Sequence, residues 1–272
     1  MDPTAARGKP GLTDSAYVLD NARQQAAARF TALADAFDPG TIRHLLDRGV
    51  GPGWRCLEVG GGGGSIATWL AQRVGPLGRV LVTDIDPRHL EALSLPNLEV
   101  RRHNIVTDPL PEAAFDLIHA RLVLMHLPER ESVLTRLVAA LKPGGWLVDE
   151  EFDSATLSPE PSARPGEHAS RTHIALRRVM ADRGVDLYFG RRLFGLLRTK
   201  GLANVGAEGR AFMWASGANA LLLRANYEQL SEAMIAARYV TAEEFGQDIA
   251  HLDDPDFMMP SMLLWAAWGQ RH

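Results

Sequence analysis

A short stretch of the sequence combines a carboxylate with a run of glycines. Glu58 precedes five consecutive glycines, residues 60–64, in LEVGGGGGS. Glycine weakens helices and strands, so this run indicates a backbone that turns tightly and lets a ligand approach without a Cβ in the way. Asp84 lies 24 positions after Gly60, at the end of another apolar run. A carboxylate there can accept hydrogen bonds from both ribose hydroxyls, so the pair predicts a site for a nucleoside-containing ligand.

Three classes of ligand commonly use such a turn: nucleoside triphosphates, dinucleotides and S-adenosylmethionine. A P-loop requires Gly-Lys followed by Ser or Thr, and no lysine lies near these glycines. A dinucleotide fingerprint counted from Gly60 places Ser65 at its third glycine, although a frame that begins at Gly62 satisfies the looser form. Glu58 would face the pyrophosphate of a dinucleotide, whereas a cationic ligand without phosphate favours an acid there. An NAD(P)-linked oxidoreductase therefore remains the weaker interpretation.

The elements that position these residues follow from an alternation of short apolar runs and helical patterns. Strands separated by helices indicate a parallel sheet with both faces covered, whose strands end along one ligand-binding edge. The fold class predicted is α/β, with a Rossmann-like, mostly parallel seven-stranded sheet. Strands are expected at residues 54–59, 78–86, 97–105, 115–121 and 146–152, and helices at 65–74, 87–94 and 129–141, with a turn at 142–145.

The chain outside this alternation is expected to cover the ligand edge. Residues 1–48 read as an N-terminal helical lid, with one helix before Pro39 and a short one after it. Residues 49–153 form the predicted binding core. Residues 154–272 are expected to complete the sheet, with a closing strand at 261–270, and to supply helices that roof an acceptor pocket.

The ordered motifs resemble those of the class I S-adenosylmethionine-dependent methyltransferases. LEVGGGGGS corresponds to the glycine motif of that family, VTDID to the segment with the ribose acid, and HNIVTDPLP with FDLIHAR to the third and fourth strand segments. LMHLPERESVLTRLVAALKPGGWLVDEE corresponds to the segment that leads into the fifth strand. The resemblance covers about residues 50–152 and is nearest to the small-molecule branch, similar to quinone-biosynthesis and natural-product methyltransferases. It implies S-adenosylmethionine as cofactor, S-adenosylhomocysteine as product and an antiparallel seventh strand.

The resemblance also implies a set of cofactor-binding residues at the strand ends and in the lid. They are Glu58, Gly60, Gly62, Asp84, Ile85, Asn104, Ile105, Ala120, Tyr17 and Arg29. Alternatives remain for several of them. Asp86 could replace Asp84 as the ribose acid, although its place before Pro87 suits a helix cap. Glu58 could be an edge charge, Arg29 an exposed helical arginine, and Asn104 stands where the family often has Asp.

The acceptor side has fewer signals. His126 follows the fourth predicted strand, at the edge where a methyl group would be transferred, and could act as a general base or simply pack. Glu151, His173 and Tyr188 are candidates for the rim of the substrate pocket. The interpretation is a methyltransferase for a small organic acceptor at carbon, oxygen or nitrogen. The alternative on the same fold is a protein that binds S-adenosylmethionine and does not methylate.

Composition excludes several other classes. The formal net charge of −4 gives no electrostatic footprint for nucleic acid or an anionic membrane. No run of 18 apolar residues and no N-terminal apolar region occurs, so neither a membrane span nor a signal peptide is expected. The single cysteine, Cys56, lies in an apolar run and is expected to be an inert buried thiol. A cytoplasmic protein without a metal is expected, and the sequence leaves its oligomeric state open.

Overall fold

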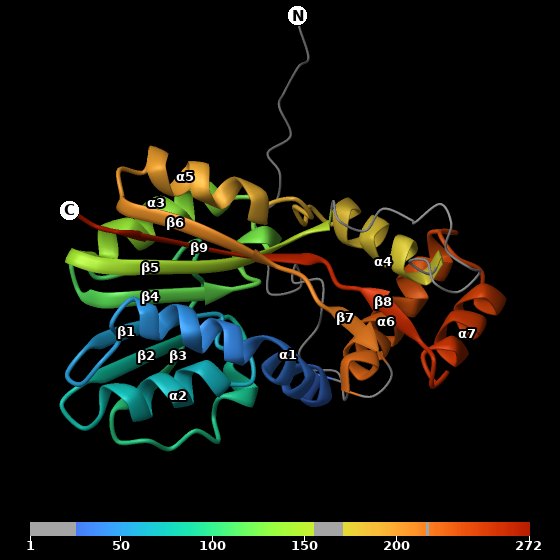
Figure 1. Cartoon of the computed structure of the whole chain (residues 1–272), viewed down its shortest axis with the longest axis horizontal. Coiled ribbons are helices and arrows are strands. Elements are labelled where there is room, and N and C mark those ends of the chain that lie inside the picture. Colours follow the sequence, from blue (N-terminus) through green and yellow to red (C-terminus); the bar gives the residue numbers. More distant parts are fainter. Residues whose placement is uncertain (1–25, 155–170, 216–217) are drawn as a thin grey trace, which may run out of the picture.

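A computed structural model describes residues 26–154, 171–215 and 218–272. Its centre is a seven-stranded sheet in the order β3-β2-β1-β4-β5-β9-β6 (Figure 1). The strands are β1 (Arg55–Val59), β2 (Arg79–Asp84), β3 (Leu98–Arg102), β4 (Phe115–Arg121), β5 (Leu141–Asp153), β6 (Ala203–Arg210) and β9 (Leu263–Gln270). Strands β1 to β5 pair in parallel, and β9 runs antiparallel to both β5 and β6. The predicted mostly parallel sheet with an antiparallel closing strand is confirmed.

The strand order reverses beside β1, because β2 and β3 lie on one side of it and β4 and β5 on the other. The connections that follow β1 and β4 therefore lead to opposite sides of the sheet. Such a switch point is where open α/β sheets bind their ligands.

Helices cover both faces of the sheet. Alternate residues of β1 pack in opposite directions: Cys56 packs with Leu70 of α2 (Ser65–Val74), whereas Leu57 packs in the cluster that contains Leu134 of α3 (Arg130–Ala140). The carboxyl-terminal part of α1 (Ala26–Asp47) joins α2 on its face, and α5 (Leu193–Thr199) joins α3 on the other. This alternation follows from the two-residue period of a strand.

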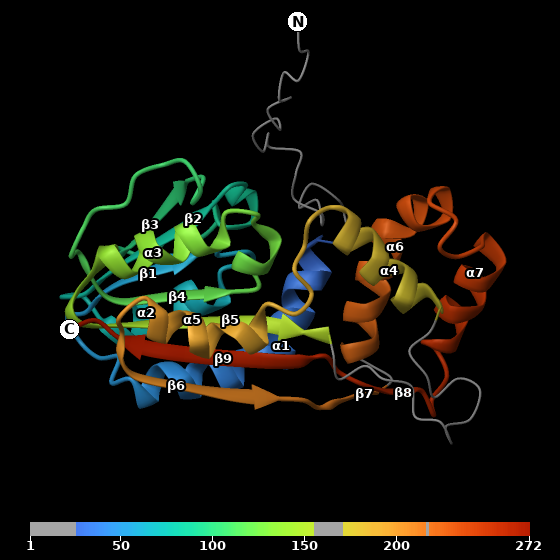
Figure 2. The ribbon, with the colours of Figure 1, turned by 90° about the horizontal axis from the view of Figure 1, so that it is seen from above.

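A helical layer extends beyond the carboxyl ends of the strands, on the right of Figures 1 and 2. It consists of α4 (Arg171–Asp182), α6 (Ala218–Ala236), α7 (Ala242–His251) and a small ribbon of β7 (Met213–Ala215) and β8 (Met258–Pro260). Helix α6 contacts α1, α4 and α7. This layer lies at the edge of the sheet where a helical roof was expected. No helix among the described residues is long and apolar enough to cross a membrane.

One predicted break is wrong. Helix α1 continues through Pro39, where two separate helices were expected. A proline inside a helix removes one backbone hydrogen bond. Phe37 and Leu45, on either side of Pro39, are both buried, so that core packing keeps both parts helical. Residues 17–25 of the expected first helix lie outside the described residues.

Three other boundaries also differ. The helix predicted at 87–94 is only a 3-10 turn, η1 (Pro87–His89), because the short segment before Pro96 offers little length for a costly helix nucleus. The turn predicted at 142–145 lies within β5, where the pairing with β4 shifts register. Strand β3 ends at Arg102, so Asn104 follows the strand rather than ending it.

Candidate active site

A cavity lies where the carboxyl ends of β1, β2 and β4 meet the helical layer. Its floor contains Gly60–Gly63 and residues that follow the strands, and its roof contains residues of α1, α4 and α6. The polar side chains that line it are Arg29, Glu58, Ser65, Thr83, Asp84, His103, Asn104, Arg121, His126, His173, Arg177 and Asn226. The cavity therefore joins the predicted cofactor edge to the predicted acceptor side.

The glycine turn has a backbone that larger residues would distort. Gly60 (φ 69°) and Gly62 (φ 53°) lie in the left-handed region. A Cβ on Gly60 would overlap the Val123 side chain, and one on Gly62 would lie 3.0 Å from the Phe30 ring. The Gly60 N–H donates to the Thr83 carbonyl across 2.8 Å, which ties the turn to β2. The run thus fits a narrow space between a strand end, α1 and the cavity.

Asp84 connects the turn to the cavity. Its Oδ2 accepts a hydrogen bond from the Gly62 N–H (3.1 Å) and its Oδ1 accepts one from the Asp86 N–H (3.0 Å). Burial raises the pKa of Asp84, and these backbone hydrogen bonds oppose the rise. Asp86 does not line the cavity; it caps η1 and accepts a hydrogen bond from Arg88 Nε (2.9 Å). Of the two candidate acids, Asp84 is the one that faces the cavity.

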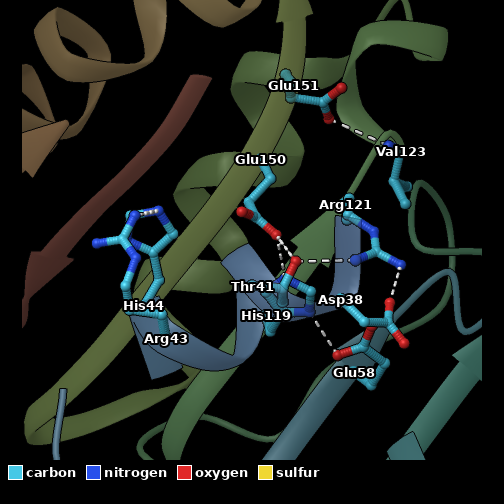
Figure 3. Close-up of polar contacts among 10 residues, drawn as sticks. All are labelled: Asp38, Thr41, Arg43, His44, Glu58, His119, Arg121, Val123, Glu150 and Glu151. Atoms are coloured by element: carbon cyan, nitrogen blue, oxygen red, sulfur yellow. Dashed lines mark hydrogen bonds and ion pairs between the residues drawn. The ribbon is translucent and has the colours of Figure 1, made fainter. Parts of the chain in front are cut away.

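A buried histidine that the sequence analysis did not single out lies between two carboxylates (Figure 3). His119 Nδ1 is 2.7 Å from Oε2 of Glu58, and its Nε2 is 3.2 Å from Oε2 of Glu150. Burial alone would lower the pKa of His119, but the two carboxylates outweigh it and raise the pKa to about 9. The imidazole is therefore charged at neutral pH and donates from both nitrogens. Glu58, which lines the cavity, is thus held from behind by a buried cation.

The same network reaches α1. Thr41 of α1 donates a hydrogen bond to Glu150, and its hydroxyl accepts one from Arg121 Nη1 (2.8 Å). Arg121 Nη2 is also 2.8 Å from Oδ1 of Asp38. Burial opposes ionisation of Glu150, but the hydrogen bond and charge of His119 outweigh it and lower the pKa of that carboxyl. These contacts fix the carboxyl-terminal half of α1 to β4 and β5.

The other half of α1 forms part of the cavity wall. Arg29, Phe30 and Leu33 line the cavity, and Arg29 is only 3% exposed. The alternative of an exposed helical arginine is therefore wrong. Tyr17, its predicted companion, lies outside the described residues.

Two histidines line the acceptor side of the cavity. Burial, with smaller effects of Arg29 and Arg130, lowers the pKa of His126 to about 4. Burial and the charge of Arg177 likewise lower the pKa of His173 to about 4, and His173 Nδ1 is 3.1 Å from the Tyr227 hydroxyl. Both imidazoles are neutral at neutral pH. The pKa of His126 thus lies well below its ordinary value of 6.5, so His126 is a weak base.

Three predicted site residues do not line the cavity. Ala120 is buried in the core of the sheet, and Tyr188 is 46% exposed. Glu151 is buried, and its Oε1 accepts hydrogen bonds from the backbone N–H groups of residues 123–125. Those residues lead into η2 (Leu124–His126). Glu151 therefore positions the turn that carries His126 and is placed to touch no ligand.

Five of the predicted cofactor residues besides Arg29 and the glycines line the cavity together: Glu58, Asp84, Ile85, Asn104 and Ile105. The sequence analysis missed Arg121, Arg177 and Asn226, which also line it. For His119, a signal existed. It is a polar residue inside the apolar strand run FDLIHAR, on the same face of the sheet as Glu58.

Comparison with known proteins agrees with this geometry. Residues 57–149 match a family model described as a methyltransferase domain. This part of the chain is therefore similar to methyltransferase domains, in agreement with the motifs of the sequence. This match begins within β1 and ends within β5, so it spans the glycine turn and Asp84.

Curated relatives share this part of the chain. Methyltransferase str2 of Strobilurus tenacellus is 38% identical over 61% of this chain and 59% of its own length. The ubiquinone/menaquinone biosynthesis C-methyltransferase UbiE of Cupriavidus taiwanensis is 27% identical over 52% of this chain and 62% of its own. The matches thus span about three fifths of these relatives. Among solved structures, a protein of Bacillus halodurans shares the fold, with a TM-score of 0.54 at 15% identity over 84% of this chain and 97% of that chain.

Proposed function

We propose that the protein transfers a methyl group from S-adenosylmethionine to a small organic acceptor. The observation that carries the proposal is the joining of the glycine turn, Asp84 and Glu58 to an apolar, roofed space within one cavity. The similarity to str2 and UbiE, both named methyltransferases, supports it. The roof restricts the space to small molecules, which argues against a nucleic acid as acceptor. The cytoplasmic location stays a prediction.

The residues present fit the proposed cofactor. The Asp84 carboxylate has lone pairs left after its two backbone hydrogen bonds and can accept from both ribose hydroxyls. Ile85 and Ile105 are placed to enclose the adenine, with Asn104 at its edge. Arg29 is placed for the carboxylate of the methionine portion, and Glu58 for its cationic portion. When bound, S-adenosylmethionine supplies a methyl group that its sulfonium has already activated.

The protein's own contribution is alignment. Holding an acceptor in line with the donor can lower a barrier by about 7–11 kcal/mol. The buried apolar walls exclude water from the acceptor. His126, held by the turn that Glu151 anchors, stays neutral and can accept a hydrogen bond from an acceptor group. Orientation is therefore the role that we propose for His126, in place of strong general-base catalysis.

Calorimetry with a matched pair of variants tests the cofactor site. Asp84→Asn should weaken the binding of S-adenosylhomocysteine by about 1.5–3 kcal/mol, which is the scale of a hydrogen bond to a charged group. Asp86→Asn, which alters the cap of η1 and the ion pair with Arg88 but no residue of the cavity wall, should bind S-adenosylhomocysteine as the wild type does. Equal affinity of the two variants would remove Asp84 from the site. Tighter binding of NADH than of S-adenosylhomocysteine would favour the oxidoreductase instead.

Transfer of a labelled methyl group to a panel of metabolites tests the activity itself. A labelled product that is absent without protein, and reduced in Asp84→Asn, is the expected result. Tight binding of S-adenosylhomocysteine with conversion of an acceptor but no labelled product would indicate the alternative function, a non-methylating reaction on the same fold.

A further inference from the structure

One face of α4 forms a wall of the cavity on the acceptor side. His173, Leu176, Arg177 and Met180 all line the cavity, and their spacing places them on one side of the helix. Arg178, the next residue along, is exposed. The chain thus directs one of two adjacent arginines toward the cavity and the other toward solvent.

Arg177 lacks the carboxylate that a half-buried arginine usually has. Its Nη2 donates a long hydrogen bond (3.4 Å) to the Tyr188 hydroxyl, and its Nε is buried without a hydrogen-bond partner. Within residues 26–154, 171–215 and 218–272, no aspartate or glutamate forms an ion pair with it. Arg121, another arginine of the cavity wall, is by contrast paired with Asp38 at 2.8 Å. Arg177 is half-buried and only its Nε is fully enclosed, so the guanidinium has room for an anionic partner from outside the described residues.

The surroundings of Arg177 do not supply a compensating charge. His173, its neighbour on the cavity face of α4, is neutral at neutral pH. The remaining wall of this side is apolar and consists of Phe152, Leu176, Met180, Leu187, Leu222 and Met262. An arginine in such a wall strongly favours a carboxylate, which its fork-shaped guanidinium can bind through two parallel hydrogen bonds.

Further polar atoms of the cavity wall have no hydrogen-bond partner in the described chain. Among them are the indole Nε1 of Trp214, a donor, and the side-chain Oδ1 of Asn226, an acceptor. Trp214 is only 3% exposed, so water from the bulk does not readily satisfy it. A neutral hydroxyl or carbonyl group of a ligand has the complementary chemistry.

We propose that the acceptor is an apolar small molecule that carries a carboxylate, and that Arg177 binds this carboxylate. The apolar wall binds the body of the molecule, and Trp214 and Asn226 are available to its neutral oxygen groups. This assignment of the substrate class rests on the proposed methyltransferase function, because it treats this side of the cavity as the acceptor pocket.

Matched acids and amides test the proposal by calorimetry in the presence of saturating S-adenosylhomocysteine. The probes are benzoate and benzamide, cinnamate and cinnamamide, and 2-naphthoate and 2-naphthamide. In the wild type, at least one acid should bind at least about tenfold more tightly than its amide, as expected for a charged hydrogen-bonded pair. Arg177→Met should remove that preference and leave the affinity of the amide unchanged. Arg177→Lys should keep part of it, because the charge remains without the fork. Arg178→Met, the matched control, should bind both probes as the wild type does.

The outcomes separate the two proposals. Failure of the wild type to bind S-adenosylhomocysteine would refute the proposed function. Normal binding of S-adenosylhomocysteine, with no acid of the panel preferred over its amide, would overturn the carboxylate assignment alone. An equal loss of acid affinity in Arg177→Met and Arg178→Met would also overturn it, because general charge would then explain the preference. If Arg177→Met is unstable, the wild-type preference and its partial loss in Arg177→Lys decide the question.

Discussion

The charged His119 between Glu58 and Glu150 predicts a specific dependence of stability on pH. We consider His119→Gln, which removes the buried cation and keeps a side chain able to donate a hydrogen bond. The pKa of His119 rises from 6.5 to about 9 on folding. A group with a raised folded pKa contributes stability that is fully present below its unfolded pKa, here 6.5. This contribution is lost as the pH rises through about 9.

The size of the effect follows from the same two values. Each pKa unit corresponds to about 1.4 kcal/mol, so the difference between 6.5 and about 9 corresponds to about 3 kcal/mol. Breaking a buried ion pair from one side typically costs about 3–5 kcal/mol, which agrees in scale. His119→Gln should therefore be less stable than the wild type by about 3 kcal/mol at pH 6, and the gap should nearly close above pH 9.

Urea denaturation followed by circular dichroism, at several pH values from 6 to 9.5, measures this gap. Other buried groups titrate in the same range, among them Asp149, whose pKa burial raises to about 8. Asp149 and Glu150 are present in both proteins, but the charge of His119 lowers the pKa of each, so the difference between the two curves reports His119 together with its effect on these carboxyls. Parallel curves, with a constant gap from pH 6 to 9.5, would refute the charged state assigned to His119.

Three further predictions concern the cavity and the strand behind it. Gly62→Val should fold but bind S-adenosylhomocysteine at least about tenfold more weakly in calorimetry, because its Cβ meets Phe30 at a left-handed backbone position. Gly51→Ala is the matched control, and normal binding by Gly62→Val would show that the glycine run is only a turn. His126→Ala should lower turnover by about tenfold and His126→Gln by less, since the proposed role of His126 is to orient the acceptor. A wild-type rate that rises with pH through an apparent pKa near 6.5, together with the absence of this rise in His126→Gln, would support general-base catalysis by His126 instead. Asp149→Asn should become more stable relative to the wild type in urea denaturation as the pH rises from 5 to 8, because Asp149 resists ionisation in the folded protein but ionises in the unfolded chain. A difference in stability that stays constant over this range would contradict the raised pKa of Asp149.

The sequence predicted those features that local patterns determine. The alternation of apolar runs and helices predicted the sheet, and the positions of Gly60 and Asp84 at strand ends placed them at the same edge. His119 was missed because its partners are 61 and 31 residues away in the chain, so no local pattern marks them as neighbours. Glu151 was proposed because it ends the fifth predicted strand, and Tyr188 because it follows a predicted helix. Neither position determines where a side chain points. The direction of Arg177 became clear only when the packing of α4 was known.

The contacts of Asp38 and Thr41 fix the carboxyl-terminal half of α1 to the strands, and α6 packs against the same helix. The amino-terminal half of α1, with Arg29 and Phe30, forms a wall of the cavity. A ligand that displaces Phe30 is therefore expected to shift Asp38 as well, about two turns further along the same helix. Asp38 forms an ion pair with Arg121, and Arg121 itself lines the cavity. One helix thus links the cavity wall at Phe30 to the ion pair between Asp38 and Arg121.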